Sequence, residues 1–152
     1  MDTCYYVGSL DEVGQHLLGQ TRGNPFGLVI DEKVMAPDSP RHYYYAEKLA
    51  MLAARTTRQR IIEIGGGYGG SALMLRRLPH AAPYVIVDLF ETCLLQYYFL
   101  KKAGLEVALV LDPSEAPDPG AIAIVPTEVS DAFFSTFTDI GIVFNSHSFS
   151  EM

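Results

Sequence analysis

The sequence predicts an α/β fold built around a mostly parallel sheet, and three observations lead to that prediction. First, β-branched residues beginning at Ile61 predict a buried strand, which then enters a turn of five glycines ending at Gly70. Second, predicted strands and helices alternate along the chain, which is typical of parallel sheets with right-handed crossovers. Third, Asp88 closes the next predicted strand, 19 residues after Gly69. In such sheets ligands bind outside the carboxyl ends of the strands.

Composition limits the class of protein. The chain has 152 residues, 49% of them hydrophobic and 19% charged, which is typical of a globular domain with a sizeable core. A net charge of −7 and the lack of a basic face argue against a nucleic-acid partner. Cys4 and Cys93 have neither metal-binding nor redox spacing, so we expect no metal site. With no leader and no membrane-length apolar run, we expect a cytoplasmic protein without a membrane partner.

The N-terminal part, residues 1–58, is predicted to be an arm and a helix that pack on the core. A short helix over 10–18 is weakened by glycines, and residues 26–35 have the pattern of a β-hairpin or an extended arm. Asp38-Ser39-Pro40 predicts a capped helix start. The helix should run to about Arg55 and bury Tyr45, Leu49, Leu52 and Ala53. The tyrosines at 43–45 have two interpretations, either core and surface residues or rings that close over a ligand.

The remaining elements follow the glycine turn. Helices are expected over 71–78, 91–103 and 130–137, the second so apolar that we expect little of it to be exposed. Three phenylalanines should cluster on the last helix: Phe133, Phe134 and Phe137. Strands are expected over 84–87, 107–111, 121–125 and 139–144, the last of them buried. The ends of four strands therefore converge on one edge of the sheet, where ligands are expected.

Two ligand classes fit the glycine turn. Gly65, Gly67 and Gly70 satisfy the dinucleotide pattern G-x-G-x-x-G. Glu63, Gly65, Gly67 and Gly69 satisfy E-x-G-x-G-x-G, which resembles the first motif of S-adenosylmethionine (SAM) methyltransferases. A carboxylate at this position would repel a pyrophosphate but suit the ammonium and sulfonium of SAM, so Glu63 favours SAM.

Further motifs suggest one family. They are N-P-F at 24–26, S-P-R-H-Y-Y-Y-A at 39–46, I-E-I-G-G-G-Y-G at 62–69, V-D-L at 87–89, L-Q-Y-Y at 95–98, V-P at 125–126 and N-S-H-S-F-S-E-M at 145–152. Over residues 24–152 the chain thus resembles bacterial SAM-dependent sugar O-methyltransferases. The glycine motif is shared by many methyltransferases, whereas the second and last motifs suggest this family.

The resemblance implies a Rossmann-like SAM-methyltransferase fold, with residues 59–152 as the cofactor-binding core. It implies methyl transfer from SAM to a hydroxyl of a sugar or glycosylated metabolite. Methyltransferases of this fold usually have seven strands, and by our count this chain stops just after strand four, so the core is expected to be truncated. An open sheet edge would then allow self-association.

The site residues follow from the motifs and the resemblance together. The expected cofactor-binding residues are Glu63, Gly65, Gly66, Gly67, Tyr68, Gly69, Asp88, Thr127, Glu128 and Asn145. Asp88 should accept hydrogen bonds from the ribose, and the adenine should lie near Pro126-Thr127-Glu128. The general base is expected to be Glu151 or His147. Each also has a structural interpretation, His147 as a loop residue bonded to backbone and Glu151 as a helix N-terminal charge.

Two other functions remain open on the sequence. An NAD(P)-dependent oxidoreductase would satisfy the glycine pattern, but it predicts an apolar residue at Glu63 and a glycine turn near the start of the chain. A non-catalytic domain that senses SAM or a nucleotide, or that acts as a scaffold, would be favoured if the chain is naturally this short. Cofactor binding distinguishes the three functions.

Overall fold

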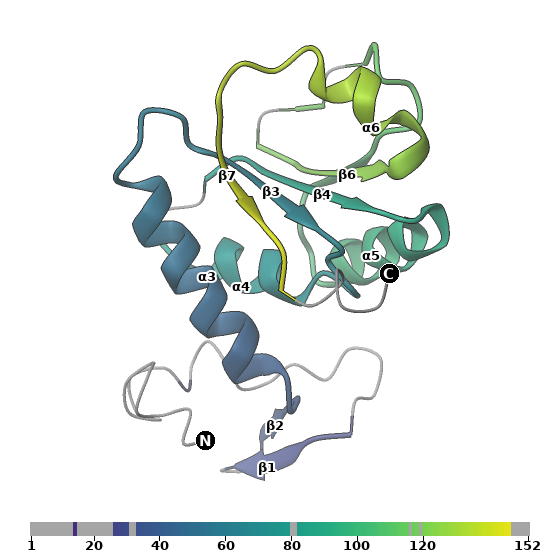
Figure 1. The fold of residues 1–152 in the computed structure, drawn as a ribbon. Coiled ribbons are helices and arrows are strands. Elements are labelled where there is room, and N and C mark those ends of the chain that lie inside the picture. The colour runs from purple at the N-terminus through teal and green to yellow at the C-terminus, as the bar shows by residue number, and fades with distance from the viewer. Residues whose placement is uncertain are drawn as a thin grey trace.

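A computed structural model of the chain describes residue 14 and residues 26–30, 33–79, 82–115, 117–118 and 120–146. A sheet of five strands forms the centre of the described part, in the order β5-β6-β4-β3-β7 (Figure 1). Every neighbouring pair in it is parallel, so the predicted α/β fold with a mostly parallel sheet is confirmed. The strands are β3 (Arg60–Ile64), β4 (Tyr84–Asp88), β5 (Val107–Leu109), β6 (Ile122–Pro126) and β7 (Ile140–Phe144).

Helices cover the two faces of the sheet unequally (Figure 1). On one face lie α3 (Ser39–Ala53), α4 (Gly70–Arg77) and α5 (Phe90–Lys102), and on the other lies α6 (Thr127–Phe134). Because side chains alternate along a strand, neighbouring residues feed different cores. Ile61 and Ile86 pack under the three helices, whereas Ile62 and Val85 pack under α6. None of the described helices is long and apolar enough to cross a lipid bilayer.

The N-terminal part begins with the predicted hairpin. β1 (Leu28–Ile30) pairs antiparallel with β2 (Lys33–Met35), and the hairpin lies beyond the end of α3, away from the central sheet (Figure 1). Met35 is buried in the same core cluster as α3 and α4. The predicted helix over 10–18 lies outside the described residues apart from Gly14.

The buried face of α3 differs from the predicted one. Leu49 and Ala53 are buried as expected, but Leu52 is half exposed, and Tyr43 and Ala46 are buried instead of Tyr45. The buried residues Tyr43, Ala46, Leu49 and Ala53 recur at intervals of three or four, so the stripe of α3 that faces the core is rotated from the predicted one.

The start of α3 is also not capped as predicted. Asp38 occupies the N-cap position but makes no side-chain capping hydrogen bond. Its carboxylate instead pairs with the guanidinium of Arg41 at 3.1 Å. Pro40 in the first turn still pre-sets the backbone for a helix, so the helix begins where expected.

The prediction that α5 is almost fully buried is wrong. Only Cys93, Gln96 and Leu100 are buried, while Tyr98 is 62% exposed and Leu95 is also exposed. The helix lies over the margin of the sheet, so a single stripe of it can face the core. Lysines one turn ahead partly cover its outer rings, as Lys102 Nζ does 5.7 Å from the ring centroid of Tyr98.

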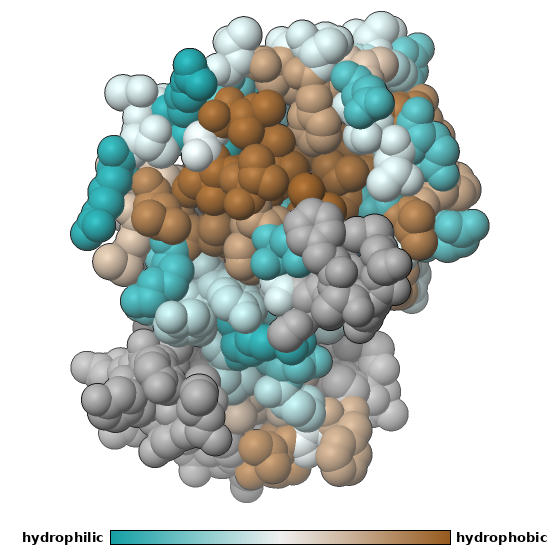
Figure 2. Space-filling model, in the orientation of Figure 1, coloured by the Kyte–Doolittle hydropathy of each residue, from teal (hydrophilic) through white to brown (hydrophobic). Residues whose placement is uncertain are grey.

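The last strand is an edge strand rather than a buried one. β7 alternates between partly buried and exposed residues, and Val143 is 62% exposed. β7 pairs with β3 on one side, and no described strand pairs with its other side. Figure 2 shows apolar surface gathered in the middle of the view, where Figure 1 draws β7. Because β5 also joins the sheet, β7 is the fifth strand, not the fourth as counted from the sequence.

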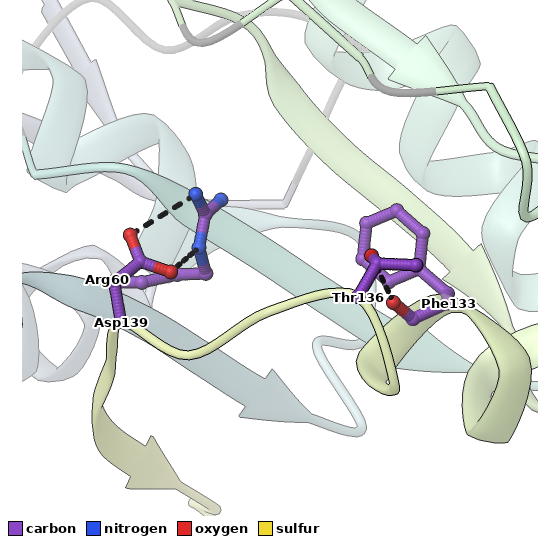
Figure 3. Close-up of polar contacts among 4 residues, drawn as sticks. All are labelled: Arg60, Phe133, Thr136 and Asp139. Carbon is purple, nitrogen blue, oxygen red and sulfur yellow. Dashed lines mark hydrogen bonds and ion pairs between the residues drawn. The ribbon is translucent and has the colours of Figure 1, made fainter.

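An ion pair joins the amino ends of β3 and β7 (Figure 3). Arg60 donates two hydrogen bonds to Asp139, at 2.9 and 3.2 Å, and its guanidinium lies 4.1 Å from the ring centroid of Phe137. In the turn that follows α6, Thr136 Oγ1 donates to the carbonyl oxygen of Phe133 at 2.7 Å. Rings of the predicted phenylalanine cluster contact each other here, with centroids 4.7 Å apart for Phe133 and Phe137. The pair formed by Arg60 and Asp139 fixes the position at which β7 enters the sheet.

Candidate functional site

The carboxyl ends of four strands meet at one edge of the sheet, as the sequence predicts. Asp88 at the end of β4 is the register partner of Pro126 at the end of β6. Asn145, directly after β7, donates from Nδ2 to the carbonyl oxygen of Ile64 at 2.8 Å, which joins the end of β7 to the start of the glycine turn. The predicted residues on these four segments therefore lie along one edge.

The glycine turn has the backbone that the sequence predicts. Gly65, Gly67 and Gly69 have φ values of 72°, 57° and 94°, in the left-handed region that favours glycine. At Gly66 a glycine is required for another reason, which is that there is no space for a side chain. A Cβ there would come within 2.6 Å of the Ile86 side chain and 3.2 Å of a Glu63 carboxylate oxygen. The turn leads into α4, whose N-cap residue Gly69 makes no side-chain capping hydrogen bond, and the first N–H groups of a helix can serve an anionic or polar group.

Glu63 lies beneath this turn and is only 1% exposed. Tyr84 donates its hydroxyl to Glu63 Oε2 at 2.9 Å. Burial raises the pKa of Glu63 to about 7, with a smaller contribution from the charge of Asp88, although hydrogen bonds from Tyr84 and Ser71 oppose the rise. Glu63 is one of the predicted cofactor-binding residues, and its carboxylate lies beneath the glycine turn, closed off from solvent.

Asp88 is held in place by two donors. Its Oδ1 accepts the backbone N–H of Leu89 at 2.9 Å, and its Oδ2 accepts Nε2 of Gln96 at 2.8 Å. The same Nε2 donates to the carbonyl oxygen of Gly67 at 3.0 Å. Gln96 is not among the residues predicted for the site, although a lone amide within the apolar run L-L-Q-Y-Y of a helix is a signal for such a role.

Tyr68 at the tip of the turn packs between two helices. Its ring lies edge-on to Phe99 of α5, with centroids 4.9 Å apart, and to His42 of α3 at 5.3 Å. Burial raises the pKa of Tyr68 to about 12, while burial and the charge of Arg41 lower the pKa of His42 to about 4. At neutral pH both side chains are therefore uncharged, and a hydrogen bond of 3.1 Å joins the Tyr68 hydroxyl to Nδ1 of His42. His42, which directly precedes the tyrosines at 43–45, therefore reaches the glycine turn.

Gly70, the first residue of α4, gives a direct test of this packing. A Cβ at Gly70 would overlap Nδ1 and Cε1 of His42, so Gly70→Ala should separate His42 from Tyr68 and destabilise the fold by about 1–3 kcal/mol. Urea denaturation measures the loss. In a His42→Ala background the obstacle is gone, and the same substitution should cost almost nothing. An equal loss in both backgrounds would contradict the contact.

The segment predicted to contact adenine is helical rather than a loop. α6 begins at Thr127, three residues earlier than predicted, and Thr127 and Glu128 are both exposed in its first turn. An acid in the first turn complements the helix dipole, which explains the early start. Beside them Leu89 is 61% exposed and follows Asp88 directly, so an apolar side chain borders the same edge. The predicted bases His147 and Glu151 lie outside the described residues.

Two other features bear on the site. A cavity of about 170 Å³ lies at the amino edge of the sheet, lined among others by Arg60, Asp118 and Phe137. It contains none of the predicted site residues and opens at the opposite edge from the glycine turn. Among the described residues no group of three or more His, Cys, Asp or Glu side chains could hold a metal ion.

The carboxyl edge thus combines a close-approach glycine turn, an uncapped helix start and an oriented carboxylate. That combination suits a ligand with a polar chain at the turn and hydroxyl groups at Asp88. No protein-family model, no curated protein and no solved structure matches this chain.

Proposed function

We propose that the chain binds SAM at the carboxyl edge of its sheet and transfers the methyl group to a hydroxyl of a sugar or glycosylated metabolite. The observation that supports this best is the pairing of the glycine turn after β3 with Asp88 on the adjacent strand β4, joined through Gln96. A turn that admits close approach and a carboxylate fixed beside it suit the amino-acid and ribose parts of one ligand.

Each residue would act on a different part of the cofactor. Asp88 would accept hydrogen bonds from the ribose hydroxyls. Leu89 offers an apolar surface for the adenine ring, with Thr127 and Glu128 at its polar edge. The backbone from Gly65 onward would run beside the methionine part, and Glu63 would act on it through its charge rather than by contact.

When bound, SAM supplies an electrophilic methyl group that the acceptor oxygen attacks, while the electrons of the broken C–S bond go to sulfur. The protein's share is to position the acceptor in line and to take its proton. We assign the proton to Glu151 or His147, which follow Asn145 in the sequence. A general base of this kind contributes about 10²–10⁴-fold to the rate.

Calorimetric titration with SAM, S-adenosylhomocysteine and NAD tests the proposal. We expect the first two to bind and NAD to bind more weakly, because a pyrophosphate would be placed above a carboxylate that is partly ionised near pH 7. Tight NAD binding without SAM binding would favour the oxidoreductase instead. SAM binding without methyl transfer to any sugar hydroxyl would favour a cofactor-binding domain.

A further inference from the structure

Gln96 joins two segments that are distant in sequence. Its side chain is fully buried in α5, yet its Nε2 group donates outward to Asp88 Oδ2 at 2.8 Å and to the carbonyl oxygen of Gly67 at 3.0 Å. Both hydrogens of the amide are thereby used on acceptors from outside the helix. One side chain connects the end of β4 with the glycine turn.

The orientation of this amide is dictated by its neighbours. The reverse orientation would place Oε1 against the Asp88 carboxylate and the Gly67 carbonyl, which are both acceptors. In the observed orientation Oε1 is buried and has no hydrogen-bond partner among the described residues. An unpaired buried acceptor lowers stability, and an apolar side chain of similar size would avoid that cost. Packing alone therefore does not explain a glutamine at this position.

The two donors fix the orientation of the Asp88 carboxylate and leave part of each oxygen open to a ligand. Leu89 N–H occupies one position on Oδ1, and Gln96 occupies one on Oδ2. A carboxylate has about four lone-pair positions, so about one on each oxygen stays available to a ligand. Two acceptors side by side match the two neighbouring hydroxyls of a ribose.

We propose that Gln96 is a positioning residue that orients Asp88 to accept both ribose hydroxyls and fixes that acceptor relative to the glycine turn. The inference rests on the proposed function, since the ribose belongs to the adenosyl cofactor. Gln96 acts through Asp88 and Gly67 and does not itself touch the ligand.

The test compares S-adenosylhomocysteine with its 2′-deoxy analogue by calorimetry on the full chain. The unchanged protein should prefer the ribose form by about tenfold or more, as expected for a hydroxyl bonded to a charged acceptor. Gln96→Met should weaken binding of S-adenosylhomocysteine by about tenfold and reduce its preference over the 2′-deoxy analogue to about twofold. The reason is that a misoriented carboxylate no longer accepts a well-aligned hydrogen bond from the 2′-hydroxyl. Leu95→Met, at the exposed neighbouring position on the same helix, is the matched control and should keep the preference.

A residue that only stabilised the fold would weaken both ligands equally, so an unchanged preference in Gln96→Met would overturn the inference. If that variant does not fold, Gln96→Asn serves instead, because its shorter amide cannot reach both acceptors and should also lose the preference. If the unchanged protein does not bind S-adenosylhomocysteine, the proposed function fails and this inference with it. Binding with a preference that survives both substitutions would overturn this inference alone.

Discussion

Asp88→Ala should weaken SAM binding by about 10- to 100-fold, since it removes a charged acceptor from the ribose hydroxyls. Asp88→Asn should be nearly as damaging. The two inner partners of Asp88, Leu89 N–H and Gln96 Nε2, are both donors, and only a carboxylate can accept on both of its oxygens. An asparagine would set its own donor against one of them. Isothermal titration of each purified variant with SAM measures the loss.

Asp112→Ala is the matched control, because Asp112 is an exposed aspartate in the loop beyond β5 whose carboxylate accepts hydrogen bonds from Ser114. It should bind SAM as the unchanged chain does. Circular dichroism confirms that each variant is folded before binding is compared. Undiminished SAM affinity in folded Asp88→Ala would remove Asp88 from the ribose site.

Glu63→Gln should make the fold more stable at pH 8 and leave it nearly unchanged at pH 4. The pKa of Glu63 is about 7 in the folded state against 4.5 in the absence of burial, so the folded chain holds a proton that the unfolded chain releases between these values. Stability is therefore fully present below pH 4.5, falls as the pH rises through 7, and above that is lower by about 3 kcal/mol. A neutral glutamine avoids that loss.

Urea denaturation from pH 4 to 8 gives this difference directly. His42 has the opposite dependence, because its lowered pKa makes stability fall as the pH drops below about 6.5, but both proteins carry it and it cancels. Glu115→Gln, at an exposed position, should leave the curve unchanged. Parallel curves for Glu63→Gln and the unchanged chain would show that the buried carboxyl does not titrate in this range.

The same carboxyl should report the charge of the cofactor. The sulfonium and ammonium of SAM would lower the pKa of Glu63 and release a proton near pH 7, whereas the pyrophosphate of NAD would raise it and take one up. Calorimetry in two buffers of different ionisation enthalpy gives the sign. Glu63→Gln should abolish the exchanged proton in either case.

The sequence predicted the helices, strands and turns well wherever the type of a single residue sets the backbone conformation. The glycine turn, the hairpin at 28–35, the start of α3 near Pro40 and the strand that ends in Asp88 all lie where expected. The parallel arrangement followed from the alternation of strands and helices. The acid spacing and the glycines also predicted which edge of the sheet holds the candidate site.

Tertiary packing decided which face of a helix is buried and which strand lies at the edge of the sheet. Sequence periodicity shows which stripes of a helix are apolar, but not which stripe the neighbouring elements cover. In α3 the covered stripe includes Ala46 and leaves Leu52 half exposed. Periodicity also cannot tell an edge strand from a central one, because that depends on the pairing order, and so the sequence wrongly predicts that β7 is buried.

The chemistry of the candidate site divides in the same way. The glycine turn and the carboxylate at Asp88 could be predicted from local sequence, because backbone freedom and strand length are local properties. Only the tertiary structure buried Glu63 beneath the turn and raised its pKa, since desolvation depends on every element packed around a group. Only the tertiary structure brought Gln96 to Asp88 and Gly67, because a hydrogen bond between a helix, a strand end and a turn exists once all three are in place.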